Sequence, residues 1–290
     1  MPLSLWSRTL KSLSDAAPIG TIVHLGAGEG RLVPDFLTAG ARHIVLQEPN
    51  RAFHAALKRL SEDEPTIEVL ESALSTAIGQ HPFMSFNVAR QSSLRQPTQL
   101  LALYPALKEV RKTVLETVTL DQVVQPVAMD ADLEHILIID CPGEEKTALD
   151  QLADLPPAKA FTHVFLRAGC LPLYHGSLGV DALAEQLKTQ GFEIKGESHA
   201  DADFTHLVLT KPRVTPAQAN DGETAEGEDP RVAEIRDLHR RLDQSERLAE
   251  RLHADLEDLR ARYGELLKHS ENQADLLGQL AGRLGAKEPE

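Results

Sequence analysis

The sequence predicts an α/β fold built on a mostly parallel sheet, followed by a linker and one long helix. Short apolar runs alternate with segments of helical length over residues 1–211, which is the pattern of a parallel sheet with crossover helices. Apolar residues spaced every three or four positions over residues 231–290 predict a single long helix there. We therefore expect an α/β domain over 1–211, a flexible acidic linker over 212–230 and a coiled coil over 231–290.

The alternation also gives the expected elements of the first domain. The expected strands cover residues 21–25, 43–47, about 66–70, 136–140, 163–167, 192–196 and 205–210. The expected helices cover residues 3–14, 29–39, 50–60, 98–109, 144–152 and 178–190. The last two strands are separated only by SHADAD, which is too short for a crossover helix, so they should pair as an antiparallel hairpin.

A glycine-rich turn after the first expected strand is the main functional signal of this domain. The strand over 21–25 is followed by Gly26, Gly28 and Gly30, and the second strand ends just before Glu48. Glycines let a backbone approach a ligand closely, and an acid after the second strand can accept both hydroxyls of a ribose. The spacing is G-x-G-x-G, not the G-x-G-x-x-G of dinucleotide-binding proteins. The pattern favours the adenosine of S-adenosyl-L-methionine (SAM) as the ligand, with a purely structural turn as the alternative.

Composition argues against several classes of function. The chain has 290 residues, of which 42% are hydrophobic, and a net charge of −14. This charge argues against unaided binding to nucleic acid or to an anionic membrane, because both are polyanions. The sequence has no apolar run long enough for a membrane span, and its N-terminal segment does not resemble a secretory signal. The two cysteines, Cys141 and Cys170, have no metal-ligand spacing, so we expect no metal site and a cytoplasmic protein.

Residues 231–290 carry a heptad pattern. From Ile235 to Leu284, alternate steps of three and four residues meet 15 positions, of which 12 are apolar. A repeat of 3.5 residues predicts a helix that supercoils with a partner. We expect a homo-oligomer through this segment, and a different coiled-coil protein is the alternative partner. The number and orientation of the strands of the coiled coil stay open.

Six segments of the first domain resemble, in order and rough spacing, those of FkbM-like methyltransferases. They are VHLGAGEG, VLQEPN, SALSTAIG, SFNVARQSSL, ETVTLDQVV and ILIIDCPGEEKTAL. The resemblance covers about residues 20–210. It implies a Rossmann-like class I methyltransferase sheet, SAM as the cofactor, and O-methylation of a glycan or small-molecule acceptor. It also implies that Gly26, Gly28 and Gly30 line the methionine end of SAM and that Glu48 binds the ribose.

The resemblance assigns roles to further positions. Asp140, Gly143 and Glu145 match the first acid, the glycine and the last acid of the family's D-x-E-G-x-E motif. Asp140 is therefore a candidate both for cofactor binding and for catalysis. Asp121, within the T-L-D motif, is the expected cap of the helix that follows it.

Three departures from the family pattern leave catalysis open. The acid usually found before the glycine-rich loop is His24, the central acid of D-x-E-G-x-E is Pro142, and a strand that often ends in an acid is followed by Arg167. Methyl transfer to oxygen needs a base or an electrophile at the acceptor hydroxyl, and these changes remove candidates for it. Two hypotheses follow: an oligomeric SAM-dependent methyltransferase, or a degenerate non-catalytic methyltransferase fold whose coiled coil mediates protein assembly.

Two loops carry other polar candidates. His175 lies in the loop after the fifth strand, at the expected ligand-binding rim, and is the candidate general base, with an ordinary loop histidine as the alternative. Ser92 and Ser93, with Arg90 and Arg95, could contact an anionic acceptor, and a polar loop is the alternative.

Overall fold

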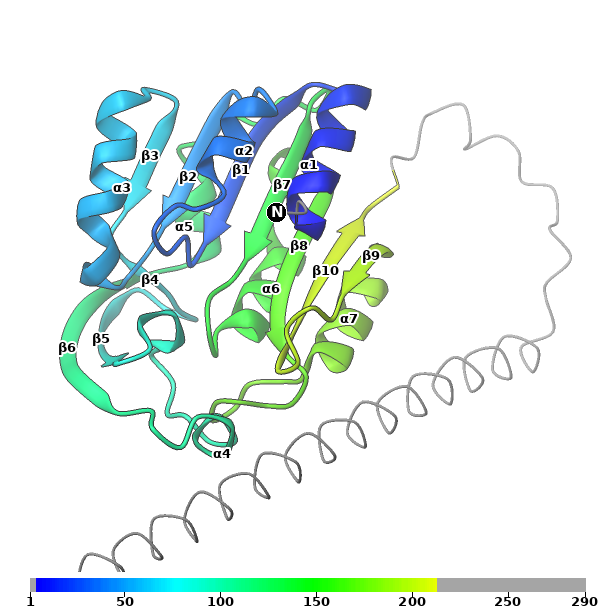
Figure 1. The fold of residues 1–290 in the computed structure, drawn as a ribbon. Helices are drawn as coiled ribbons and strands as arrows, with labels where there is room; N and C mark the ends of the chain where they lie inside the picture. Colours follow the sequence, from blue (N-terminus) through cyan, green and yellow to red (C-terminus); the bar gives the residue numbers. More distant parts are fainter. Residues whose placement is uncertain (1–3, 213–290) are drawn as a thin grey trace, which may run out of the picture. The chain divides into compact units, whose positions relative to one another are not determined.

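A computed structural model describes residues 4–212, which hold almost the whole predicted α/β domain (Figure 1). The predicted coiled coil and all but the first residue of the predicted linker lie outside the described residues. The domain is organised around one seven-stranded sheet. Its strands are β1 (Ile19–Leu25), β2 (His43–Gln47), β3 (Ile67–Leu70), β7 (Glu134–Ile139), β8 (His163–Gly169), β9 (Glu193–Ser198) and β10 (Phe204–Thr210).

The order of the strands in this sheet is β3-β2-β1-β7-β8-β10-β9. Five strands, in the order β3-β2-β1-β7-β8, run parallel to one another. Strand β10 runs antiparallel to both β8 and β9. This confirms the predicted mostly parallel sheet that ends in an antiparallel hairpin. The chain connects β1 to β2 on one side and places β7 on the other, so the connections diverge between β1 and β7. In open α/β sheets such a switch point forms a crevice at the carboxyl ends of the strands.

Helices cover both faces of the sheet, because consecutive strand residues point to opposite faces and both sets are apolar. Figure 1 shows α1 and α2 in front of the sheet and α6 and α7 behind it. On the first face, Trp6, Phe36 and Leu57 pack with strand residues such as Ile22 in one core. On the second face, a core around Val23 joins the sheet to the other helices. The helices of the two faces are α1 (Leu5–Ala16), α2 (Val33–Thr38) and α3 (Arg51–Asp63), and α5 (Leu120–Val124), α6 (Glu145–Asp154) and α7 (Val180–Thr189).

A second, smaller sheet lies between β3 and β7 in the sequence, and sequence analysis missed it. Its three strands have the order β4-β6-β5, with β5 antiparallel to β6. The elements of this insertion are β4 (Ala73–Leu74), β5 (Gly79–Phe86), η1 (Ala89–Gln91), α4 (Leu100–Leu103) and β6 (Glu109–Val118). Outside the insertion, a short turn of 3-10 helix, η2 (Pro157–Lys159), precedes β8.

Two local predictions are wrong in this region. The helix predicted over 98–109 is only the four residues of α4, because Tyr104 precedes a proline and adopts φ −121° and ψ 74°, outside the helical region. Asp121 does not cap α5. The cap is Thr119, whose hydroxyl accepts a hydrogen bond from the Gln122 N–H in a capping box, and Asp121 lies in the first turn.

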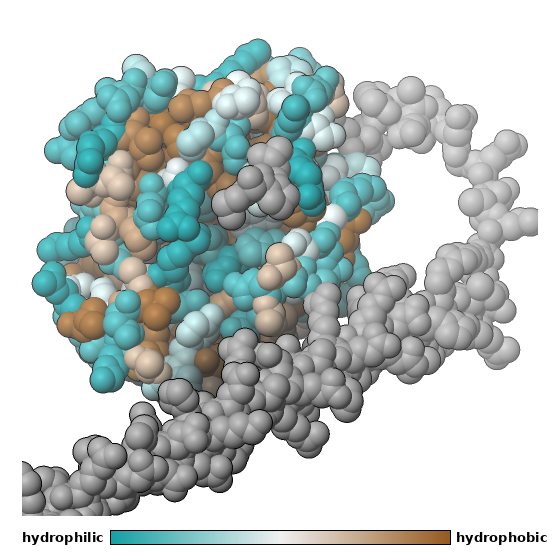
Figure 2. Space-filling view, in the orientation of Figure 1, coloured by the Kyte–Doolittle hydropathy of each residue, from teal (hydrophilic) through white to brown (hydrophobic). Residues whose placement is uncertain are grey.

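The face of the domain that Figure 2 shows is mainly hydrophilic, with hydrophobic patches among the polar side chains. Within residues 4–212 we find no helix that is both long enough and apolar enough to cross a membrane.

Candidate functional site

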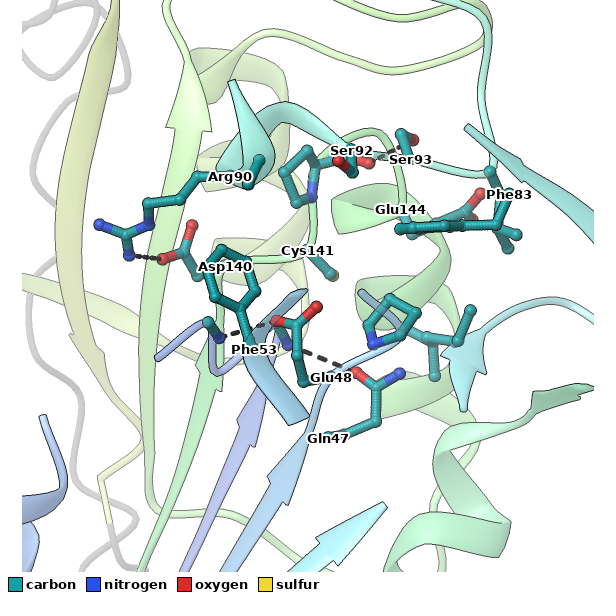
Figure 3. Close-up of a pocket in the computed structure, with 18 residues that line it drawn as sticks. Gln47, Glu48, Phe53, Phe83, Arg90, Ser92, Ser93, Asp140, Cys141 and Glu144 are labelled. Atoms are coloured by element: carbon teal, nitrogen blue, oxygen red, sulfur yellow. Dashed lines mark hydrogen bonds and ion pairs between the residues drawn. The ribbon is translucent and has the colours of Figure 1, made fainter. Parts of the chain in front are cut away.

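A pocket opens at the carboxyl edge of the sheet, at the switch point between β1 and β7 (Figure 3). Its empty space, including the open mouth, is about 520 Å³. The lining residues come from both sides of the switch point and from the insertion: Gly26, Gly28, Gln47, Glu48, Pro49, Phe53, Ala73, Leu74, Phe83, Ala89, Arg90, Ser92, Ser93, Leu94, Asp140, Cys141, Pro142 and Glu144. The pocket is narrow, so a nucleoside enters it only if flanking side chains move.

The glycine-rich loop forms one wall of the pocket, and its three glycines have different structural roles. Gly26 has φ +78°, and a Cβ there would lie 2.0 Å from the carbonyl oxygen of Asp140, so only glycine lets the loop pass this close to the end of β7. A Cβ at Gly30 would lie 2.6 Å from Leu60 Cδ1, so this glycine serves packing against α3, and it is not among the lining residues. Gly28 lines the pocket, and of the described residues only Arg90 comes within 4 Å of the place where its Cβ would stand, with Nε at 3.9 Å.

Glu48 lies at the end of β2 and joins this strand to the glycine-rich loop. Its Oε2 accepts a hydrogen bond from the Gly28 N–H at 2.7 Å, and its Oε1 accepts one from the Asn50 N–H at 2.7 Å. The residue is 5% exposed, and burial raises the pKa of its carboxyl from 4.5 to about 7, although both hydrogen bonds lower it. A carboxylate has about four lone-pair sites, so each oxygen can still accept one hydroxyl from a ribose.

Asp140 follows β7 on the other side of the loop, and two arginines bind it. Arg90 Nη2 donates to Oδ2 at 3.1 Å, and Arg167 Nη1 donates to Oδ1 at 3.1 Å. The Arg167 side chain is 12% exposed and lies over the Phe204 ring, with 3.7 Å from Cζ to the ring centroid. The Arg90 side chain is 46% exposed. The sequence does not indicate that Arg90, Asp140 and Arg167 form a trio, because 50 residues separate Arg90 from Asp140.

A second carboxylate of the rim, Glu144, is also paired. Arg95 donates from Nε to Oε1 at 2.6 Å and from Nη2 to Oε2 at 3.1 Å, and Thr147 donates its hydroxyl to Oε2 at 2.6 Å. The Ser93 hydroxyl donates to the carbonyl of Pro142 at 2.6 Å. Arg95 and Ser93 therefore connect the insertion to the loop after β7.

The insertion segment that carries Arg90 is anchored to the main sheet. Asn50 Nδ2 donates to the carbonyl of Ala89 and to the Ser92 hydroxyl, both at 3.1 Å. The Tyr174 hydroxyl donates to the carbonyl of Gln91 at 2.8 Å. The backbone of η1 is thus held on both flanks of Arg90.

The structure does not bring His175 to this pocket. Its backbone N–H donates to the carbonyl of Gln96, its side chain is exposed, and it is not among the lining residues. Of the residues predicted for the site, Gly26, Gly28, Glu48 and Asp140 lie together around the pocket.

His24, which stands where the resembling family has an acid, is buried beneath the loop. Neither ring nitrogen has a hydrogen-bond partner, and the ring packs edge-on against Phe36 at 5.9 Å. Burial lowers its pKa to about 4, so the ring is neutral at pH 7. His24 therefore contributes no charge to this side of the switch point at pH 7.

Comparison with known proteins gives only distant likenesses. No protein-family model matches the chain, and no curated protein matches it. Among solved structures, it is similar to a putative type 11 methyltransferase from Sulfolobus solfataricus, at 10% identity and a TM-score of 0.39 over 78% of this chain and 100% of that one. It is similar to M. capricolum TrmK in complex with S-adenosyl-homocysteine, at 10% identity and a TM-score of 0.37 over 76% of each chain. It is also similar to methyltransferase FkbM from Methylobacillus flagellatus KT, at 15% identity and a TM-score of 0.40 over 66% of this chain and 44% of that one. Likenesses this distant assign neither a family nor an activity to the chain.

Proposed function

We propose that this chain is a SAM-dependent methyltransferase whose cofactor site is the pocket between Gly28, Glu48 and Asp140. The observation that carries the proposal is the position of Glu48. A buried carboxylate at the end of β2, directly beside an open glycine loop at a switch point, is the arrangement that holds a ribose in α/β proteins.

The residues present fit an adenosine-type cofactor. Gly28 has no Cβ, so a ligand can approach the backbone there once Arg90 moves, and Glu48 would accept the ribose hydroxyls. The ring of Phe53 and the side chains of Leu74 and Phe83 supply apolar surface for a base. Gly26 and Gly30 would position the loop through its close approach to Asp140 and to α3. When bound, SAM supplies an electrophilic methyl group.

Two residues are our candidates for the chemistry at the acceptor. Asp140 lies at the pocket between two guanidinium groups, where it would orient bound groups. We keep His175 as the candidate general base for an acceptor hydroxyl, on a glycan or small molecule, that docks over the loop after β8.

One observation favours a second function, a non-catalytic nucleoside-binding scaffold. Among the lining residues of the described domain, Asp140 and Glu144 are both bound by arginines. A carboxylate in an ion pair is a poor base, so neither of these two side chains is suited to remove a proton from an acceptor. In that case the coiled coil would recruit a partner protein.

We propose further that residues 231–290 assemble the chain into a homo-oligomer, on the strength of the heptad pattern alone. Light scattering on the full chain and on a chain truncated after residue 212 measures this directly. We expect an oligomer for the full chain and a monomer for the truncated one. The same number of chains per particle in both proteins would refute the assembly role.

The cofactor is tested by mass spectrometry of the full chain purified from cells. We expect a bound adenosine-type nucleoside, released on denaturation, and an increase in melting temperature on addition of SAM or S-adenosylhomocysteine. Absence of both a bound nucleoside and a thermal shift at millimolar ligand would refute the enzyme and the nucleoside-binding scaffold together. Binding without methyl transfer to any hydroxyl acceptor would leave the scaffold.

A further inference from the structure

The positive and negative charges around the pocket are unevenly paired at Asp140. Of the residues in the described domain that line the pocket, Arg90 is the one with a positive charge. Asp140 receives two guanidinium groups although it carries one negative charge. One cation of the trio is therefore in excess.

Of the two arginines that bind Asp140, Arg90 is the one that can move away from it. Arg167 is nearly buried and packs on Phe204, so its guanidinium is fixed against Asp140. Arg90 is half exposed, and within residues 4–212 its guanidinium donates one hydrogen bond, to Asp140. A guanidinium has five N–H donors, so most of those of Arg90 are available to a ligand. If Arg90 swings away, Asp140 still keeps the ion pair with Arg167.

Arg90 also stands at the correct place to meet a ligand. Its Nε lies 3.9 Å from the position that a Cβ of Gly28 would occupy, so it covers the open part of the glycine loop. Figure 3 shows its side chain reaching Asp140 from the segment that also carries Ser92 and Ser93. The backbone on both sides of Arg90 is anchored, so the side chain can move without the segment moving.

Of the four residues that the sequence marks for contact with an anion, Arg90 is the one in the described domain that both carries a positive charge and lines the pocket. Arg95 forms a two-point pair with Glu144. The hydroxyl of Ser92 accepts from the Phe86 N–H and from Asn50, and that of Ser93 donates to Pro142.

We infer that Arg90 binds an oxyanion of the nucleoside ligand, on the 5′ side of its ribose and opposite its base, and releases Asp140 to Arg167 when the ligand enters. The oxyanion is a carboxylate, as on the amino-acid end of SAM, or a phosphate, as on a nucleotide. The inference rests on the proposed function for one point, the placement of the ribose at Glu48. The exchange also widens the pocket, because the side chain that covers Gly28 moves.

Three ligands and three variants of the full chain test this inference by calorimetry. 5′-Methylthioadenosine has no anionic group, S-adenosylhomocysteine adds a carboxylate, and AMP carries a phosphate. The variants are Arg90→Ala, Arg90→Lys and, as a matched control, Arg111→Ala, which removes an exposed arginine of β6 outside the lining. Thermal melting checks that each variant is folded.

We expect Arg90→Ala to weaken binding of the carboxylate or phosphate ligand by about 10- to 100-fold, which is the effect of losing hydrogen bonds to a charged group. Binding of 5′-methylthioadenosine should not weaken, Arg90→Lys should lose less than Arg90→Ala, and Arg111→Ala should match the wild type. Added salt should weaken the anionic ligand more in the wild type than in Arg90→Ala.

The other outcomes separate this inference from the proposed function. Equal binding of S-adenosylhomocysteine to the wild type and Arg90→Ala overturns the role of Arg90 and leaves the methyltransferase proposal. Arg90-dependent binding of AMP, with no binding of S-adenosylhomocysteine, supports Arg90 and overturns the methyltransferase proposal. Equal losses for all three ligands overturn the inference, because Arg90 then acts on the pocket as a whole. No binding of any ligand to the wild type overturns both.

Discussion

Two carboxylates flank the glycine-rich loop, and they are held in different ways. Glu48 is bound by the backbone N–H groups of Gly28 and Asn50, whereas Asp140 is bound by the side chains of Arg90 and Arg167. Backbone donors are fixed by the course of the chain, but a half-exposed side chain can change partners. The comparison indicates that the β2 end of the pocket is preformed and that the β7 end rearranges when a ligand binds.

The largest expected effect comes from the loop that separates the two ends. Gly26→Ala places a Cβ 2.0 Å from the Asp140 carbonyl at a positive φ, so we expect the free energy of unfolding to fall by about 3–5 kcal/mol. Gly40→Ala is the matched control, since Gly40 has φ +71° and nothing within 4 Å, and it should cost about 1–2 kcal/mol. Urea unfolding measures both. Equal losses would show that the loop does not need its close approach to β7.

The next effect concerns the preformed end and depends on pH. The folded chain raises the pKa of Glu48 to about 7, above its ordinary 4.5. Between these values the folded chain holds a proton that the unfolded chain has released. The contribution of Glu48 to the free energy of unfolding therefore falls as the pH rises from about 4.5 to about 7, by up to about 1.4 kcal/mol per pH unit. Burial raises the pKa of Glu145 to about 7 as well, and it adds in the same direction.

Glu48→Gln removes one of these two contributions. Unfolding at pH 5 and pH 7.5 should then show a smaller difference in stability for this variant than for the wild type. Glu62→Gln, at an exposed position of α3, is the control and should behave as the wild type. An unchanged difference in Glu48→Gln would mean that the buried carboxyl titrates normally.

A smaller effect is expected at the end held by side chains. Arg95→Met leaves the buried Glu144 without its two-point partner, while Thr147 still donates to it. We expect a loss of about 1–3 kcal/mol, because an unpaired buried carboxylate is costly and Arg95 itself is partly exposed. In a double-mutant cycle with Glu144→Gln, most of this loss should disappear. Additive losses would contradict a coupled pair.

The smallest effect is expected at His175, which lies outside the lining. His175→Ala should change the free energy of unfolding by less than about 0.5 kcal/mol, as for an exposed loop residue. Affinity for S-adenosylhomocysteine should also stay unchanged, and only methyl transfer should fall if His175 is the base. A clear loss of affinity would extend the pocket to the loop after β8 and weaken the contrast between the two ends.

The same comparison explains how much the sequence could predict. The preformed end follows from local order along the chain: an apolar strand, a glycine turn and an acid after the next strand. Sequence analysis therefore placed Gly28 and Glu48 together, and the strands of the main sheet with them. The elements that could not be predicted lie in the insertion, where Pro82 in β5 obscures a strand and the apolar residues before Pro105 resemble a helix.

The contacts at the β7 end of the pocket could not be predicted, because they join distant parts of the chain. Arg90 and Arg95 come from the insertion, Asp140 and Glu144 follow β7, and Arg167 belongs to β8. No spacing in the sequence indicates which arginine meets which acid. The one available signal was the cluster of Arg90, Ser92, Ser93 and Arg95, which marked the segment but not its partners.

Calorimetric titration of the full chain with S-adenosylhomocysteine, for the wild type and Glu48→Gln, tests the ribose site most directly. We predict saturable binding at one site per chain, and a loss of at least about tenfold in affinity in the variant, since the amide loses the negative charge and one of the two acceptor oxygens. Equal affinity in both proteins, or no heat of binding to the wild type at millimolar ligand, would contradict the account.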